Sequence, residues 1–488
     1  MNARLSVAIA TLLLAPPTLA GQAPAAAGAP DIPVSARDRV YLAEQFSNTV
    51  SVVDPSTNRH LGVIKLGDTQ PANMSPLYRG QVLVHGLGFS PDHRTLAVVS
   101  IGSNSVTFID TATNKVKHTT YVGRSPHEAF FTPDGKELWV TVRGEDYLAV
   151  LDPRTYQETG HIAVPTGPGM TIFSPDGKYG YVCSSFTPET VVVDAAAHQI
   201  VGRVKQESPF CPNIAAAPEG DQVWLTLKDV GKVMVFQARP PFQVLKVLST
   251  GPITNHVNFV HTSRGRFAYV TLGGLNQVAV HRMDGDFSRV ATIPVGALPH
   301  GVWPSGDGTR IYVGLENADG LAVIDTATNK VIATLAAGQA PQAIAYVPEA
   351  VPTGAGTENL QPLAQAQSAA HLQLAPPGGE PATTVALFDQ GLTQVLQAAV
   401  TGLEPKKQYV LALSGQADGS GALEPLARFT TNPAGAAIVN AVGPIRQVVD
   451  PRQPATRRYL VLAPAGLDGA PGKPVQLERA PDGAGASR

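Results

Sequence analysis

Charged residues, cysteines and long apolar stretches are all scarce in this chain of 488 residues. Charged residues make up 15% of it, and the formal net charge is −2 at pH 7. A nucleic-acid binder needs a basic face to neutralise phosphates, so no nucleic-acid partner is expected. No run of about eighteen apolar residues occurs, which leaves no candidate transmembrane segment.

Sequence motifs that mark common catalytic and metal sites are also absent. The chain has only two cysteines, Cys183 and Cys211, and no CxxC or CxxCH sequence. A thiolate zinc site and a covalently attached c-type haem are therefore not expected. GxSxG, HExxH, Walker and GxGxxG motifs are missing as well. In an oxidising compartment Cys183 and Cys211 are predicted to form a disulfide, and the alternative is two buried apolar thiols.

The N-terminus has the features of an export signal. Arg4 precedes an apolar run over 5–15, and Thr18-Leu19-Ala20, with small residues at 18 and 20, offers a cleavage site. This pattern predicts a signal peptide over 1–20, followed by an N-terminal linker over 21–37. The protein is then expected to be periplasmic or secreted.

An internal repeat with a period near 43 residues dominates the chain. The octapeptide IDTATNKV occurs identically at 109–116 and 324–331. Turn sequences related to SPDG recur through the same region, and each is followed by short strands rich in Val, Tyr and Leu. Four short strands at this period are typical of one propeller blade. The repeat therefore predicts an all-β fold, with a seven-bladed β-propeller over 38–350.

Particular residues of the repeat resemble a known family. Tyr269-Val270-Thr271 and Tyr312-Val313-Gly314, with a lead-in of the form P-H-x-x-x-x-S-P-D-G, resemble the YVTN-repeat β-propellers of bacteria and archaea. Haem-binding propellers of nitrite reductases and some propeller lactonases are more distantly similar. The resemblance covers roughly residues 38–350 and implies a scaffold rather than an activity.

The ring needs a strand from each end of the repeat region. Residues 40–66 supply only the three outer strands of the first blade, and 342–347 supply its missing inner strand. Closure by both ends would remove exposed sheet edges. The spacing between the first two blades also predicts an insertion within 67–84.

A candidate site follows from aligning the seven repeats. The residue six positions before each turn proline should lie in a ring at one mouth of the central channel, and across the blades it is His85, His127, Gly169, Pro212, His256, His300 and Gln342. Imidazole is a common metal ligand and acid–base group. The four histidines could bind a metal, bracket a haem or hold an anion; alternatively, they only fix blade geometry. The insertion should cap this mouth, with Tyr78 and Arg79 pointing inward as further ligand-binding candidates.

A second domain is predicted after the propeller. Residues 351–380 are rich in Pro, Ala, Gln and Gly and are interpreted as a linker. Strand candidates continue through 381–478, where the spacing of Leu403, Pro405 and Tyr409 resembles the tyrosine corner of fibronectin-type sandwiches. This predicts a small β-sandwich-like domain, or else a set of hairpins without such a corner. Residues 479–488 are expected to be a disordered tail.

Together these patterns favour an exported binding or scaffold protein without catalytic activity. It would recognise an unidentified small ligand or protein partner at the His-bearing face of the channel. The alternative is a metal- or haem-dependent oxidoreductase, or a lactonase-type hydrolase, acting through the same face. A purely structural envelope protein is a third hypothesis. The sequence leaves the identity of any cofactor open.

Overall fold

The structure is a computed structural model that describes residues 33–67, 82–363, 369–380, 382–389, 394–443, 445, 449 and 457–479. The predicted signal peptide, most of the N-terminal linker and all but the first residue of the expected tail lie outside these ranges. So do positions 68–81 of the predicted insertion, which include Tyr78 and Arg79.

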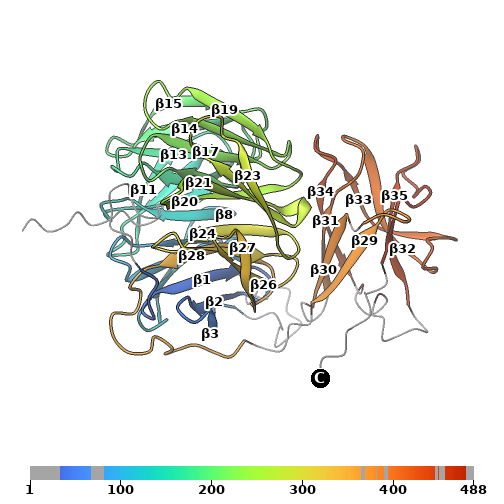
Figure 1. Ribbon diagram of the computed structural model, residues 1–488, viewed down its shortest axis with the longest axis horizontal. Coiled ribbons are helices and arrows are strands. Elements are labelled where there is room, and N and C mark those ends of the chain that lie inside the picture. The colour runs from blue at the N-terminus through green and yellow to red at the C-terminus, as the bar shows by residue number, and fades with distance from the viewer. Residues whose placement is uncertain are drawn as a thin grey trace, which may run out of the picture.

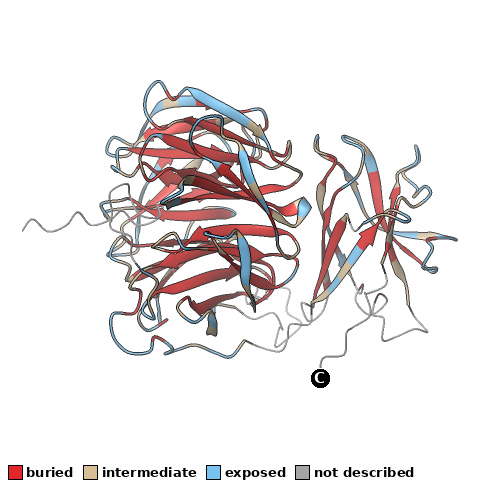
Figure 2. Ribbon diagram, in the orientation of Figure 1, coloured by how far each residue is buried: buried red, intermediate tan, exposed pale blue. Residues whose placement is uncertain are grey.

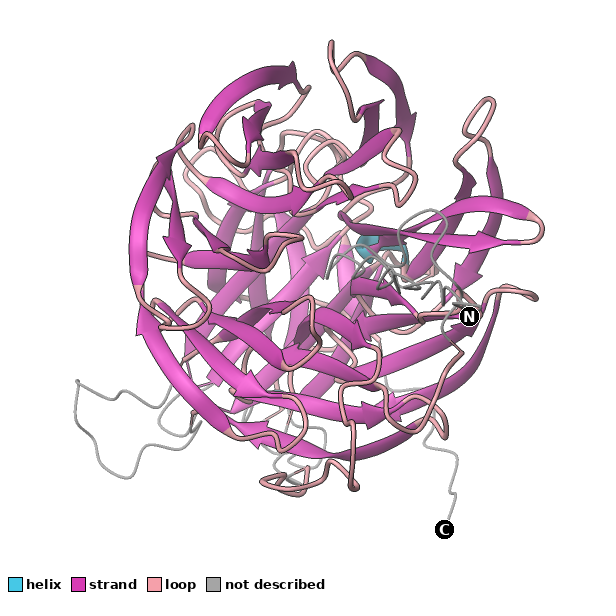
Figure 3. Ribbon diagram, turned by 90° about the vertical axis from the view of Figure 1, so that its left-hand side faces the viewer, coloured by secondary structure: helices cyan, strands magenta, loops and turns pink. Residues whose placement is uncertain are grey.

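Seven four-stranded antiparallel sheets form a ring around a central channel (Figure 3). From the inner to the outer strand, blade 1 consists of β28 (Pro341–Val347), β1 (Arg39–Glu44), β2 (Thr49–Asp54) and β3 (Arg59–Lys65). Blade 2 consists of β4 (Val84–Phe89), β5 (Thr95–Ser100), β6 (Ser105–Asp110) and β7 (Val116–Tyr121). Blade 3 consists of β8 (Pro126–Phe131), β9 (Leu138–Val142), β10 (Tyr147–Leu151) and β11 (Glu158–Ala163). Blade 4 consists of β12 (Pro168–Phe173), β13 (Tyr179–Ser184), β14 (Glu189–Asp194) and β15 (Gln199–Lys205).

The remaining blades follow the same plan. Blade 5 consists of β16 (Ile214–Ala216), β17 (Gln222–Leu227), β18 (Lys232–Gln237) and β19 (Val244–Ser249). Blade 6 consists of β20 (Thr254–Thr262), β21 (Gly265–Leu272), β22 (Gln277–Arg282) and β23 (Arg289–Pro294), with the short 3-10 helix η1 (Gly273–Leu275) after β21. Blade 7 consists of β24 (Pro299–Pro304), β25 (Arg310–Leu315), β26 (Gly320–Asp325) and β27 (Lys330–Ala336).

Burial explains why the inner strands of each blade are apolar and the outer strands are mixed. The second strand of each blade packs between neighbouring blades, so β5, β9, β13 and β17 are buried along their whole length. The outer strands β7, β11, β19 and β27 are largely exposed (Figure 2). Trp139 and Trp224 are fully buried between blades, where their large apolar area stabilises the packing.

The predicted closure of the ring is confirmed. β28 pairs antiparallel with β1, and Tyr346 lies opposite Val40 in the register. Two segments about three hundred residues apart in the chain therefore share one sheet, which gives the first blade its fourth strand like the other six.

The C-terminal domain is one antiparallel sheet of eight strands rather than two separate sheets. The strand order is β33 (Leu423–Thr430), β32 (Gln408–Ser414), β35 (Tyr459–Pro464), β36 (Gln476–Glu478), β29 (Ala370–Ala375), β30 (Thr383–Asp389), β31 (Gln394–Val400) and β34 (Ala437–Gly443). The edge strands β33 and β34 lie against each other, so the sheet is nearly closed around its apolar core.

Two details differ from or refine the sequence interpretation of this region. β29 begins at Ala370, inside the stretch interpreted as a linker, and its burial alternates as in a half-buried strand. The backbone N–H of Glu404 donates to the hydroxyl of Tyr409 at 3.3 Å, which is the contact expected of a tyrosine corner.

The first part of the predicted linker is attached to the propeller. Gln361 exchanges two backbone hydrogen bonds with Val63 of β3, at 2.8 and 2.9 Å. The side chain of Asn114 donates to the carbonyl of Gly356 at 3.0 Å. These bonds lead the chain along the outer edge of blades 1 and 2 and onward to the second domain.

The C-terminal domain packs against the end of the propeller where the inner strands begin (Figure 1). Phe388 stacks on Phe46 of blade 1, with ring centroids 4.4 Å apart. A second apolar cluster joins Ala399 and Ala436 to Ile253 and Leu298, which precede the inner strands of blades 6 and 7. Among the described residues no helix is long and apolar enough to cross a membrane.

Candidate functional site

The aligned histidines occupy β-bulges in the inner strands. The pairing of β4 with β5 steps from Val84 opposite Ser100 to Leu87 opposite Val98, which accommodates one extra residue beside His85. The inner strands of blades 1, 3, 4, 6 and 7 show the same irregularity at the aligned position. A bulge re-aims the local side chains, and here it brings the aligned residues together at the channel mouth.

In blades 3, 5 and 6 a threonine in the second strand bonds to the backbone of the inner strands. The hydroxyl of Thr271 accepts a hydrogen bond from the backbone N–H of His256 at 2.8 Å and donates to the carbonyl of His300 at 2.7 Å. Thr141 and Thr226 occupy the same position in blades 3 and 5 and also donate to an inner-strand carbonyl of the following blade. In these three blades the threonine therefore links the second strand to the inner strand of the next blade.

The four histidines form one buried cluster. The Nε2 atoms of His85 and His127 are 2.9 Å apart, and the ring centroids of His256 and His300 are 4.8 Å apart. The Nδ1–H of His127 donates to the carbonyl of Gly169 at 2.7 Å, so the Nε2–H of His85 is the donor between the two rings. All four side chains are nearly inaccessible to solvent.

Three of the four histidines are uncharged at neutral pH. Burial lowers the pKa of His85, His127 and His256 well below the ordinary range, and neighbouring positive charges such as that of Arg143 lower the first two further. Imidazoles in this state present lone pairs, so any positive charge at the mouth comes from other residues.

Glu316 carries the negative charge of the cluster. It follows β25, and its Oε2 accepts a hydrogen bond from Nδ1 of His300 at 2.6 Å. Burial opposes its ionisation, but His300, Lys228 and Gln342 outweigh burial and lower the pKa of Glu316 to about 2. Its other oxygen, Oε1, accepts from Nε2 of Gln397 in the C-terminal domain at 2.7 Å. The second domain therefore contributes a side chain to the cluster.

Two half-buried cations lie at the rim of this mouth. Arg143 follows β9 and Lys228 follows β17, and their charged groups lie 6.0 and 5.7 Å from the ring centroid of Phe210. Arg143 also lies 5.9 Å from the ring of Phe186, which is 57% exposed. In the part of the chain that the structure describes, no carboxylate comes within ion-pair distance of either cation.

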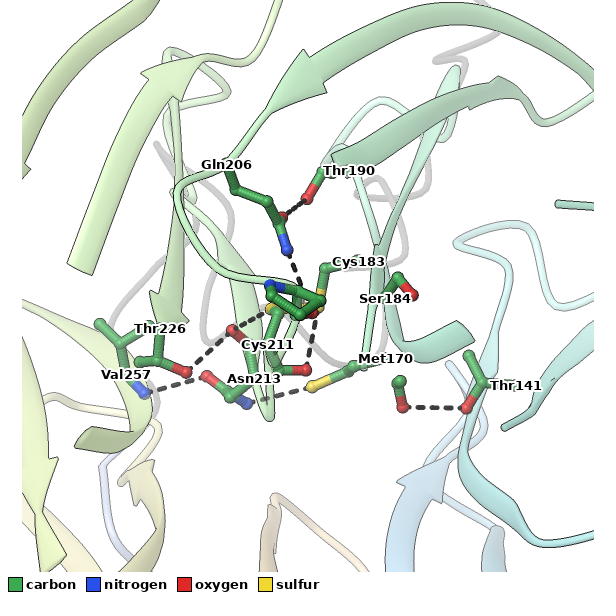
Figure 4. The surroundings of a disulfide bond; sticks show 12 residues. Thr141, Met170, Cys183, Ser184, Thr190, Gln206, Cys211, Asn213, Thr226 and Val257 are labelled. Carbon is green, nitrogen blue, oxygen red and sulfur yellow. Dashed lines mark hydrogen bonds between the residues drawn. A yellow bond between two sulfur atoms is a disulfide. The ribbon is translucent and has the colours of Figure 1, made fainter. Parts of the chain in front are cut away.

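A disulfide between Cys183 and Cys211 anchors the loop that carries Phe210 (Figure 4). Their Cα atoms are 6.0 Å apart, and the backbone N–H of Cys211 donates to Ser184 of blade 4. Two residues further on, Nδ2 of Asn213 donates to Nδ1 of His256 at 3.4 Å. The disulfide therefore positions both the aromatic ring at the rim and a polar contact of the cluster.

The channel beneath the cluster is narrow and largely apolar. The cavity in the channel has a volume of about 30 Å³, which is room for about two water molecules. Met170, Trp303 and Ile344 are among the residues that line it. Glu128 also lines it, and burial raises the pKa of Glu128 to about 8 although the backbone N–H of Leu87 bonds to its carboxyl group.

The structure thus brings His85, His127, His256, His300 and Gln342 to one place, while Tyr78 and Arg79 lie outside the described residues. Glu128 and Glu316 lie beside these residues. Sequence reasoning missed Arg143, Lys228, Phe210 and Gln397. The signal for two of them was present, because Arg143 and Lys228 occupy the same repeat position as Glu316, one residue after the second strand.

Comparisons with known proteins agree on the fold alone. No protein-family model matches the chain, and no curated protein sequence matches it. Hydrazine synthase from Kuenenia stuttgartiensis is similar in structure, with a TM-score of 0.50 and 19% identity over 56% of this chain and 92% of that one. A functionally unknown protein from Desulfotomaculum acetoxidans DSM 771 gives a TM-score of 0.53 and 15% identity over 63% of this chain and 98% of that one.

Proposed function

We propose that this protein is an exported binding protein that takes up a small organic anion at the His-bearing mouth of the propeller, beneath the edge of the C-terminal domain. The observation that carries the proposal is the pair of cations, Arg143 and Lys228, placed around Phe210 without a carboxylate partner among the described residues. Partly buried cations require a counter-charge, and an anionic ligand would supply it.

The position of the second domain supports a confined site. Its contacts, as far as the described residues show, reach blades 1, 2, 5, 6 and 7 and leave blades 3 and 4 uncovered. Arg143 and Phe186 lie on those uncovered blades. A ligand entering there would meet the two cations first, an aromatic surface beside them and the neutral imidazoles further in. Recognition sites commonly combine an apolar wall with a few convergent polar groups.

The chemistry of the rim indicates what kind of anion fits. Phe186 and Phe210 offer flat apolar faces, and guanidinium and ammonium groups bind carboxylates by charge-assisted hydrogen bonds. A carboxylate on a flat or apolar body matches both features. Export is proposed on the N-terminal sequence, and the disulfide is of the kind that persists in an oxidising compartment.

Calorimetric titration of the full chain with benzoate, phthalate, citrate and inorganic phosphate tests the proposal. We expect the aromatic carboxylates to bind most tightly, with an affinity that falls as NaCl rises because the contact is ionic. Arg143→Gln and Lys228→Gln should each weaken binding at least about tenfold, the size of one charge-assisted hydrogen bond. Lys232→Gln, at a cation of the same blade that pairs with Glu207, is the matched control and should bind as the wild type does.

The proposal fails if none of the four anions binds, or if binding persists unchanged when both cations are replaced. A preference for inorganic phosphate over the aromatic carboxylates would contradict the proposed ligand class while leaving the site in place.

A further inference from the structure

Three neighbouring side chains in blades 2 and 3 have the arrangement of a metal centre. His85, His127 and Glu128 each place one potential ligand atom within 4.8 Å of the others. Their exposed fractions are 8%, 5% and 3%. The two Nε2 atoms are 2.9 Å apart, and ligands at a right angle on a metal with bonds of about 2.0–2.1 Å would be about 2.9 Å apart.

One group in this set, the carboxyl group of Glu128, has no counter-charge within ion-pair distance among the described residues. It bonds to the backbone N–H of Leu87. A buried carboxylate without a cation is costly, and a metal ion would supply the missing positive charge.

The surrounding backbone is shaped to hold the three groups. Nδ1–H of His127 donates to the carbonyl of Gly169, which fixes the tautomer whose Nε2 lone pair faces His85. A Cβ atom at Gly86 would approach an oxygen of Glu128 to 2.6 Å, so the glycine leaves the room that this carboxyl group occupies. The bulge at His85 and the glycine after it are therefore both needed for the arrangement.

We propose that His85, His127 and Glu128 together bind one divalent first-row transition metal ion at the mouth of the channel. Two imidazoles and one carboxylate are a ligand set that suits iron(II), and His₂Glu sets also hold zinc. Three protein ligands leave the other coordination positions open, and the channel has room for water beside Glu128. His256 and His300 lie outside this set. The inference goes beyond the proposed function, because metal binding here requires neither Arg143 nor Lys228.

Titration of the chelator-treated full chain with Co²⁺, followed by visible absorption and by calorimetry, tests the inference. We expect one ion per chain, with ligand-field bands that show nitrogen and oxygen ligation. Glu128→Gln keeps the shape of the protonated glutamate side chain but removes the carboxylate, and it should weaken Co²⁺ binding at least about tenfold. His127→Gln should weaken Co²⁺ binding to a similar extent. Zn²⁺ should compete with Co²⁺ for the same site.

Two controls keep this result separate from anion binding and from misfolding. His281→Gln alters another buried histidine whose Nδ1 faces a carbonyl, in blade 6, and should bind Co²⁺ as the wild type does. The double variant Arg143→Gln/Lys228→Gln should lose the anion and keep the metal. The inference is overturned if the wild type binds no Co²⁺ or Zn²⁺ at millimolar concentration, or if Glu128→Gln, folded by circular dichroism, binds Co²⁺ with unchanged affinity.

Discussion

Gln397 of the C-terminal domain donates a hydrogen bond of 2.7 Å from its Nε2 to Oε1 of Glu316 at the mouth of the propeller channel. Both side chains are buried. A buried carboxylate stays ionised only when hydrogen-bond donors and cations stabilise its negative charge. One of the hydrogen-bond donors to Glu316 comes from the second domain. The C-terminal domain is therefore part of the His-bearing site and not only an appended module.

Replacing Gln397 by alanine should destabilise the protein measurably. The substitution removes one hydrogen bond to a buried charged group, which is worth about 1.5–3 kcal/mol. Chemical denaturation followed by tryptophan fluorescence measures the loss. Gln373→Ala, at an exposed glutamine of β29, is the control and should change stability by less than about 0.5 kcal/mol. Equal stability of the two variants would show that the Gln397 contact contributes nothing.

Thr271 should be a stronger determinant of blade stability than its small size suggests. Valine at this position keeps the shape but leaves the backbone N–H of His256 and the carbonyl of His300 without this partner. We expect Thr271→Val to cost about 1–3 kcal/mol. Thr271→Ser retains the hydroxyl and should recover most of that loss in the same thermal unfolding experiment. A valine variant as stable as the serine variant would rule out the linking role of the hydroxyl.

Loss of the disulfide should affect both stability and the proposed anion site. The bridge closes a loop with a sequence separation of 28 residues, worth about 3–4 kcal/mol in the chain-entropy model. The Cys183→Ser/Cys211→Ser variant should therefore melt at a lower temperature. Because Phe210 lies next to Cys211, the variant should also bind phthalate more weakly. Mass spectrometry without reductant gives a direct check, since alkylation of both thiols in the wild type would contradict the bridge.

The contribution of Glu44 to stability should decrease as the pH rises from about 4.5 to about 7. Its carboxyl group is buried among the hydroxyls of Thr49 and Ser51 and the backbone N–H of Gly338. Burial raises the pKa of Glu44 from 4.5 to about 7, although these donors oppose the shift. The folded protein thus holds a proton that the unfolded chain releases in this range.

The sign follows from proton linkage. Below about pH 4.5 Glu44 is protonated in both the folded and the unfolded state. Above about pH 7 it is ionised in both, and its contribution to the free energy of unfolding is about 3 kcal/mol smaller than below about pH 4.5. Glu44→Gln should remove this part of the pH dependence, as seen in melting temperatures from pH 4 to 8. The exposed Glu424→Gln is the control and should leave the profile as it is. A profile for Glu44→Gln that parallels the wild type would contradict the raised pKa.

The fold of the propeller was accessible from the sequence because the signals are local and repeated. IDTATNKV at two places and the turn prolines at a regular spacing mark each blade, and every blade meets the same packing problem. The closing strand β28 could be predicted because a three-stranded first blade leaves an unpaired edge. The start of β29 at Ala370 was missed because polar residues alternate with apolar ones in a region biased toward Pro, Ala and Gln.

Only part of the candidate site could be predicted in the same way. The repeat alignment placed His85, His127, His256 and His300 on one rim, since equivalent positions of equivalent blades must form a ring. It could not give the 2.9 Å contact of His85 with His127, because that distance depends on the bulges and on the tautomer set by Gly169.

What the sequence determined by itself is the all-β ring, its number of blades and the rim on which the histidines lie, because each follows from short-range pattern and repetition. The tertiary structure alone decided that the second domain covers part of this rim and that Gln397 reaches Glu316. It also decided that Arg143 and Lys228 meet around Phe210. These contacts join segments far apart in the chain, and their geometry depends on packing between domains and blades, which no local pattern encodes.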